Sequence, residues 1–211
     1  MENMTLDPTY LASFQADLVA LSAAEMFTKY VVPDVCHGLP DIDQLALRQA
    51  VATQYGVEIE RVMIVGSAKI GFTLTLKKAK SAAEKDRPPF SPFSDRSDVD
   101  VAIISDALFD DIWKRAFEFW HSSGYAKVAN YWPRGRDFRE YVFRGWMRPD
   151  MLPNEASIQI QDEWFEFFRH VTNAGYAGSY PIKAGLYREH YFLERYQSQS
   201  LEKAKQERIL S

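Results

Sequence analysis

The sequence predicts an α/β (α+β) fold: a small mixed sheet backed by helices, with further helices at both ends of the chain. Two short apolar runs, at residues 61–65 and 99–104, have the length and β-branched content of buried strands. Longer segments with apolar residues at helical spacing precede, separate and follow these runs. A chain of 211 residues can form one compact domain, so we expect a single domain with a core at about 57–170 and a helical extension at about 183–211.

Two helices are expected before the first strand. Asp7-Pro8 is a typical helix start, and the apolar residues that follow it at helical spacing are Leu11, Phe14, Leu18 and Leu21. We expect this helix to continue until Pro33 and the Cys36-His37-Gly38 stretch break it. The second helix should begin at Asp41 and end at Gly56, because glycine commonly follows the last turn of a helix.

A third helix should follow the second strand, because Ser105-Asp106 can cap it and Gly124 can end it. Three strand-like segments are expected next, at 126–131, 141–146 and 157–161. Residues 163–170 have the pattern of a short aromatic helix, and 172–181 form a loop. From Lys183 onward we expect helix, fraying in the polar tail 198–211.

Asp98 and Asp100 indicate a site. They alternate with Val99 and Val101 in an apolar strand, so both carboxylates should lie on one face, with Cα atoms roughly 6–7 Å apart. Such a pair suits one divalent cation shared by both acids, or two oxygen-ligated cations. Upstream, Gly66-Ser67 forms a turn directly after the first strand, where backbone N–H groups and a hydroxyl can hold phosphate. These features predict a site for a metal-bound nucleoside triphosphate.

The Gly66-Ser67 turn and the Ser97-Asp98-Val99-Asp100 strand together resemble the nucleotidyltransferase superfamily of the DNA polymerase beta type. The resemblance covers about residues 60–105 and implies a minimal mixed fold that transfers a nucleoside monophosphate from a triphosphate such as ATP, using Mg²⁺ or Mn²⁺. Carried over, Gly66 and Ser67 would hold phosphate, while Asp98 and Asp100 would bind metal and carry catalysis.

The chain departs from this family in two ways. Residues 68–97 separate the turn from the acidic pair, where compact members have a much shorter link; the extra stretch is basic and proline-bearing, and such a surface loop can lengthen without moving the flanking strands. The family's usual third acid, on a later strand, also has no counterpart in the predicted strand 157–161, which presents Ser157, Gln159 and Gln161 on one face. Asp150, Glu155 and Asp162 flank that strand, and the sequence does not choose among them.

Cationic side chains supply further candidates. Lys69 follows the turn by two residues and could neutralise triphosphate charge, or simply be an exposed lysine. Five arginines and two acids occur between Arg134 and Arg148, among aromatic residues that can stack on bases. The arginines favoured as phosphate or acceptor contacts are Arg134, Arg136 and Arg139; the alternative is a set of surface arginines paired with nearby acids.

Composition excludes several other classes. A net charge of −4 does not indicate general nucleic-acid binding, and a single cysteine, Cys36, excludes an intramolecular disulfide framework and a multi-cysteine zinc site. No apolar run is long enough to span a bilayer and no secretory signal opens the chain, so we expect a cytoplasmic protein without membrane association.

Three functions remain open. The first is an active nucleotidyltransferase whose acceptor is an RNA end, a protein or a small molecule; its resemblance to compact bacterial types allows a protein partner in a toxin–antitoxin or defence module. The second is a catalytically degenerate nucleotide- or RNA-binding sensor, which the missing third acid favours. The third is a sugar-nucleotide glycosyltransferase, against which the upstream Gly-Ser turn argues.

Overall fold

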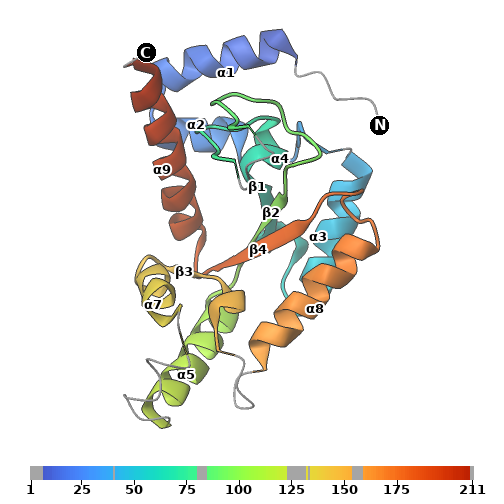
Figure 1. Cartoon of the computed structure of the whole chain (residues 1–211), viewed down its shortest axis with the longest axis vertical. Helices are drawn as coiled ribbons and strands as arrows, with labels where there is room; N and C mark the ends of the chain where they lie inside the picture. Colours follow the sequence, from blue (N-terminus) through green and yellow to red (C-terminus); the bar gives the residue numbers. More distant parts are fainter. Residues whose placement is uncertain are drawn as a thin grey trace.

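The computed structural model describes residues 7–39, 41–79, 85–122, 132, 134–153 and 159–209. Within these ranges, a four-stranded sheet of order β1-β2-β4-β3 is covered by helices on both faces, which confirms the predicted α+β class (Figure 1). The strands are β1 (Val62–Val65), β2 (Val99–Ile104), β3 (Trp146–Met147) and β4 (Ile182–Tyr187).

β2 is central because it pairs with a strand on each side. It runs antiparallel to β1, with Val65 opposite Asp100, and parallel to β4, with Asp100 opposite Lys183. β3 is antiparallel to β4, with Trp146 opposite Tyr187. β1 therefore ends where β2 and β4 begin, so Val65, Asp100 and Lys183 share one end of the sheet, whereas β3 pairs with the last two residues of β4.

The alternation of side chains along β2 divides the core in two. Val99, Val101 and Ile103 pack with the helices α3 (Asp41–Tyr55), α5 (Asp106–Ser122) and α8 (Ile160–Asn173). Ala102 and Ile104 face the other core, which is built with α1 (Pro8–Ala20), α2 (Ala23–Tyr30) and α9 (His190–Ile209). Figure 1 shows α3 and α8 on one side of the sheet and α9 on the other.

The N-terminal half matches the predicted elements with one correction. Asp7 caps α1, α3 has the predicted bounds, and Gly56 follows α3 with a φ of +62°. The expected single helix from Pro8 to Pro33 is wrong: α1 ends at Ala20 and α2 begins at Ala23. Ser22 breaks the helix because its hydroxyl and the Glu25 carboxylate form a reciprocal capping box.

The C-terminal half differs from the predicted elements in more places. The expected strand 141–146 is wrong, since helix α7 (Gly135–Phe143) occupies most of it and β3 begins only at Trp146. The expected strand 157–161 is also wrong where it is described, because Ile160 and Gln161 open α8. Residues 157–158, and the strand expected at 126–131, lie outside the described residues.

The helix expected from Lys183 is wrong as well, since β4 occupies 182–187 and α9 begins only at His190. β4 forms because Ile182, Ala184 and Leu186 face the α3–α8 core while the strand hydrogen bonds to β2. The polar tail expected to fray is helical through Ile209, with Leu201 and Ala204 buried against the α1–α2 side.

The inserted segment between β1 and β2 forms an irregular antiparallel arm, described at residues 71–79 and 85–93. The short helix α4 (Gly66–Ile70) leads into it, Phe93 N–H donates to the Gly71 carbonyl at 2.8 Å, and Lys77 and Arg87 exchange two backbone hydrogen bonds. β1 and β2 remain paired on either side of the arm, as the sequence predicted. Short 3₁₀ turns, η1 (Ile59–Arg61) and η2 (Pro149–Met151), precede β1 and follow β3.

Candidate active site

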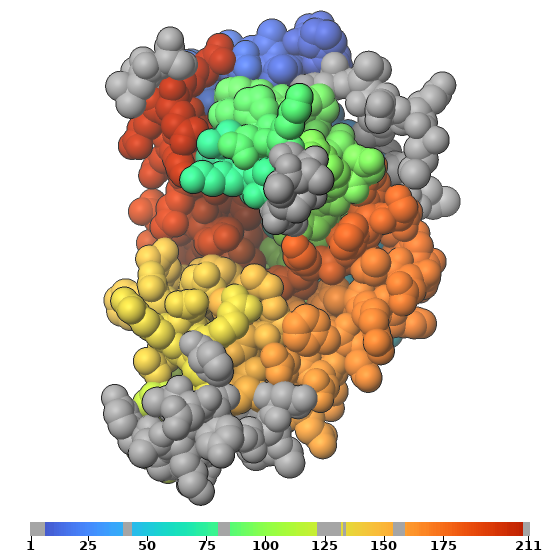
Figure 2. All heavy atoms as spheres, viewed as in Figure 1, coloured from blue at the N-terminus to red at the C-terminus, as the bar shows by residue number. Residues whose placement is uncertain are grey.

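Polar residues next to β1, β2 and β4 meet at one end of the sheet, and Arg148, which follows β3, lies near enough for its charge to act on Asp100. Gly66 follows β1, Asp98 and Asp100 open β2, Lys183 is the second residue of β4, and Arg148 follows β3. Figure 2 shows a hollow on this face, bounded by α9, the arm between β1 and β2, and residues 134–153. The arm contributes Lys77 and the segment 134–153 contributes Arg148, and the charges of both act on Asp100.

Gly66 fixes the turn against Asp100. Its φ is +68°, a left-handed conformation, and a Cβ atom added there would lie 2.8 Å from Asp100 Oδ2. A residue with a side chain would be strained at this φ, and the Asp100 carboxylate would have to shift to make room for its Cβ atom. The Gly66-Ser67 turn and Asp100 therefore lie next to each other, although 30 residues separate the turn from the acidic pair in the chain.

Asp98 is paired with a cation that the sequence did not single out. Its carboxylate forms a salt bridge with the Lys183 ammonium group, and the side chains are 32% and 52% exposed. The parallel register of β2 and β4 explains the encounter, because Lys183 is the backbone neighbour of Asp100. Because helix is expected from Lys183 onward, the sequence does not place the Lys183 side chain beside Asp98.

Asp100 lies in an unfavourable environment for a charged carboxylate. Burial, followed by the negative charge of Asp98, raises the pKa of Asp100 to about 6. Positive charges on Lys183, Lys77 and Arg148 oppose this rise. Cations from β4, the arm and the end of β3 thus surround two carboxylates that repel each other.

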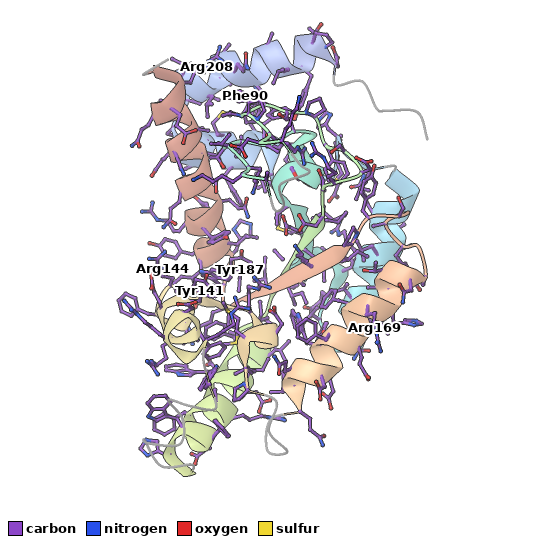
Figure 3. The ribbon with its side chains drawn as sticks, in the orientation of Figure 1. Phe90, Tyr141, Arg144, Arg169, Tyr187 and Arg208 are labelled. Atoms are coloured by element: carbon purple, nitrogen blue, oxygen red, sulfur yellow. The ribbon has the colours of Figure 1, made fainter. Side chains whose placement is uncertain are left out.

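Aromatic side chains occupy the α9 side of the site. Trp146 stacks on Tyr141 at a centroid distance of 4.1 Å and contacts Tyr187 and Tyr196 at 6.0 and 4.8 Å. Figure 3 shows Tyr141 and Tyr187 where α7, β4 and the base of α9 come together. Burial, together with the charge of Asp100, raises the pKa of both Tyr187 and Tyr196, so these phenols stay neutral beside the acidic pair.

The other predicted cations lie elsewhere. Lys69 is buried on α4, where its ammonium group donates to the Pro33 carbonyl and desolvation lowers its pKa. Arg134 and Arg136 are exposed at the start of α7, and Arg139 lies over the Trp120 ring at 4.6 Å. From this arginine-rich segment it is Arg148 whose charge acts on Asp100.

A third carboxylate is absent from the strand beside the acidic pair, because β4 carries none. Asp150 is buried and held by Arg148 through two hydrogen bonds, of 3.1 and 2.5 Å. Asp162 is exposed in the first turn of α8, on the helix layer that covers the opposite face, and Glu155 lies outside the described residues.

The donor set at the acidic pair fits a Mg²⁺ ion that arrives with phosphate ligands. Magnesium is commonly bound by one or two carboxylates plus substrate phosphates and water, rather than by a complete protein cage. Among the described residues no group of three or more His, Cys, Asp or Glu side chains is placed to hold a metal. A dication between Asp98 and Asp100 would remove the repulsion that the raised pKa of Asp100 reflects.

A separate pocket of about 180 Å³ lies on the other face, between α3, α5 and α8. It is lined by Tyr55, Arg115, Glu163 and Trp164 among others, and shares no residue with the acidic site.

Within the described part of the chain, no helix has both the length and the apolar character needed to cross a membrane. Comparison with known proteins adds no relative: no protein-family model, no curated protein and no solved structure matches the chain.

Proposed function

We propose that this protein is a Mg²⁺-dependent nucleotidyltransferase that binds a nucleoside triphosphate, ATP among the candidates, at the end of its sheet and passes the nucleoside monophosphate to an acceptor hydroxyl. The observation that carries the proposal is the contact between Gly66 and Asp100. A turn suited to phosphate and a carboxylate suited to metal lie so close that a Cβ atom at residue 66 would come within 2.8 Å of Asp100 Oδ2.

Each residue of the site has a role in this reaction. Asp98 and Asp100 would hold the magnesium ion, which supplies Lewis-acid neutralisation of the triphosphate oxygens. Gly66 and Ser67 position the phosphates from the β1 side. In the transfer, the bond between the α-phosphorus and the bridging oxygen to the β-phosphate breaks while a bond to the acceptor oxygen forms, and the proton of the acceptor hydroxyl passes to water. Lys77 and Arg148 offset the charge of the departing pyrophosphate.

A second function, nucleotide sensing without turnover, is favoured by Lys183. The strand beside the acidic pair presents an ammonium group where a third carboxylate would help activate the acceptor hydroxyl. A site of this composition still attracts a metal-bound triphosphate. It would simply lack one of the groups that accelerate transfer.

Transfer can be tested with the four α-phosphate-labelled ribonucleotides, supplied one at a time with Mg²⁺ and total cellular RNA. Asp98→Asn and Asp100→Asn remove one charge each, and Asp95→Asn is the matched control because Asp95 is exposed three residues upstream. Label that moves into RNA, protein or a new small product with wild type and Asp95→Asn, and not with the other two, supports transfer. Metal-dependent binding without transfer supports the sensor; neither binding nor transfer refutes both functions.

A further inference from the structure

The ammonium group of Lys183 lies at the acidic pair, close to where a metal cation bound by both carboxylates would lie. Lys183 is paired with Asp98 through its ammonium group and is the backbone neighbour of Asp100 across the parallel ladder, so it faces both carboxylates. Its charge also opposes the burial that disfavours ionised Asp100. A divalent cation bound to the same two carboxylates would meet this ammonium group at close range.

Lys183 is also free to move. Half of its side chain is exposed, and ion pairs between exposed groups are worth little, so leaving Asp98 costs little free energy. Two of the other cations near the pair are fixed more firmly: Arg148 is held by the buried Asp150, and Arg87 donates to Ser97 Oγ and the Pro92 carbonyl. Among these three cations, Lys183 is the one that can change partner without breaking a buried interaction.

We propose that Lys183 is a displaceable internal counter-ion: it neutralises Asp98 in the free protein and transfers its ammonium group to the triphosphate when a metal-bound nucleotide arrives. The proposal rests on the nucleotide-binding function proposed above. Displacement of Lys183 would make the binding of metal and nucleotide cooperative. Metal alone must compete with Lys183 for Asp98, whereas metal with a triphosphate gives Lys183 a new anionic partner.

The substitution Lys183→Met separates these two effects. It removes the competing charge and keeps the length of the side chain, so Mn²⁺ alone should bind about tenfold more tightly than to wild type. The same variant loses a phosphate contact, so ATP should bind about tenfold more weakly at saturating Mg²⁺. Each tenfold change corresponds to about 1.4 kcal/mol.

Free Mn²⁺ measured by electron paramagnetic resonance gives the metal affinity without nucleotide, and calorimetric titration gives the ATP affinity. Lys29→Met is the matched control, because Lys29 forms a similar exposed pair with Asp17 at 2.5 Å on a different part of the surface. This control should leave both affinities unchanged. Lys183→Gln is a second variant, and thermal unfolding verifies that each protein is folded.

Tighter Mn²⁺ binding together with weaker ATP binding, in both Lys183 variants, supports the counter-ion. Unchanged or weaker Mn²⁺ binding in both folded variants overturns it, even if wild type binds ATP. If Mn²⁺ binds more tightly to the variants but no protein binds ATP, the nucleotide function fails while the competition at Asp98 stands. The two failures are therefore distinguishable.

Discussion

Replacing Gly66 with alanine should destabilise the protein through two separable effects. The first is backbone strain, because an L-residue at a φ of +68° costs about 1–2 kcal/mol. The second is the contact of the new Cβ with Asp100 Oδ2 at 2.8 Å, which forces the carboxylate off its rotamer at a cost of about 0.5–1.5 kcal/mol. We expect the free energy of unfolding to fall by about 2–3 kcal/mol in total, or the melting temperature by about 4–12 °C.

Gly56→Ala isolates the backbone effect. Gly56 has nearly the same φ, +62°, but a Cβ there would meet nothing within 4 Å. Gly56→Ala should therefore lower the free energy of unfolding by about 1 kcal/mol less than Gly66→Ala does. The contact itself is tested by repeating Gly66→Ala in an Asp100→Ala background, where the colliding oxygen is gone.

Urea unfolding of wild type, Gly66→Ala, Asp100→Ala and the double variant gives the coupling free energy between positions 66 and 100. We expect about 1 kcal/mol, beyond the roughly 0.3–0.5 kcal/mol within which independent sites add. If Gly66→Ala costs the same in both backgrounds, or no more than Gly56→Ala, then the turn and the acidic pair do not touch. The reasoning that joins them into one site would be refuted.

Three further predictions concern the charges around the site. Folding raises the pKa of Asp100 from about 3.8 to about 6, so the folded protein holds this proton more strongly and its stability falls as pH rises from about 4 to 6. In urea titrations, Asp100→Asn should therefore be about 2–3 kcal/mol more stable than wild type at pH 7 but not at pH 4. Arg148→Met leaves the buried Asp150 unpaired and should lower the free energy of unfolding by about 2–4 kcal/mol. The control Arg144→Met, whose pair with Glu140 is exposed, should lower it by less than about 0.5 kcal/mol, and equal losses in thermal melts would contradict the assigned pairing. Lys69→Met should leave ATP affinity within about twofold, because its ammonium group contacts the Pro33 carbonyl; a tenfold loss in calorimetry would place Lys69 at the phosphates instead.

Local sequence signals predicted the elements that surround the acidic pair. Asp7-Pro8, Asp41, Gly56 and Ser105 mark helix ends through capping, and the β-branched run 99–104 has the exact bounds of β2. The break between α1 and α2 also has a local signal, the capping box of Ser22 and Glu25, within a segment whose apolar spacing indicates one continuous helix.

β4 could not be predicted in the same way, because its formation depends on a distant partner. Its face toward α9 carries Lys183 and Gly185, which have low strand propensity. Its pairing with β2 brings together residues such as Lys183 and Asp98 that are 85 positions apart. The acidic pair and the Gly66-Ser67 turn were therefore visible in the sequence, whereas Lys183 and the approach of Arg148 required the sheet. Arg134 and Arg136 are favoured by the sequence because they flank Gly135, which predicts a loop, whereas in the structure α7 begins at Gly135.

The central claim, that the end of the sheet binds a metal-bound nucleoside triphosphate, is tested most directly by a crystal structure with Mg²⁺ and a non-hydrolysable α,β-methylene analogue of ATP. The account predicts a metal ion between the carboxylates of Asp98 and Asp100, phosphates against the Gly66-Ser67 turn, and the Lys183 ammonium group moved from Asp98 to a phosphate oxygen. A nucleotide bound elsewhere, or carboxylates that remain paired with Lys183 at saturating analogue, would contradict it.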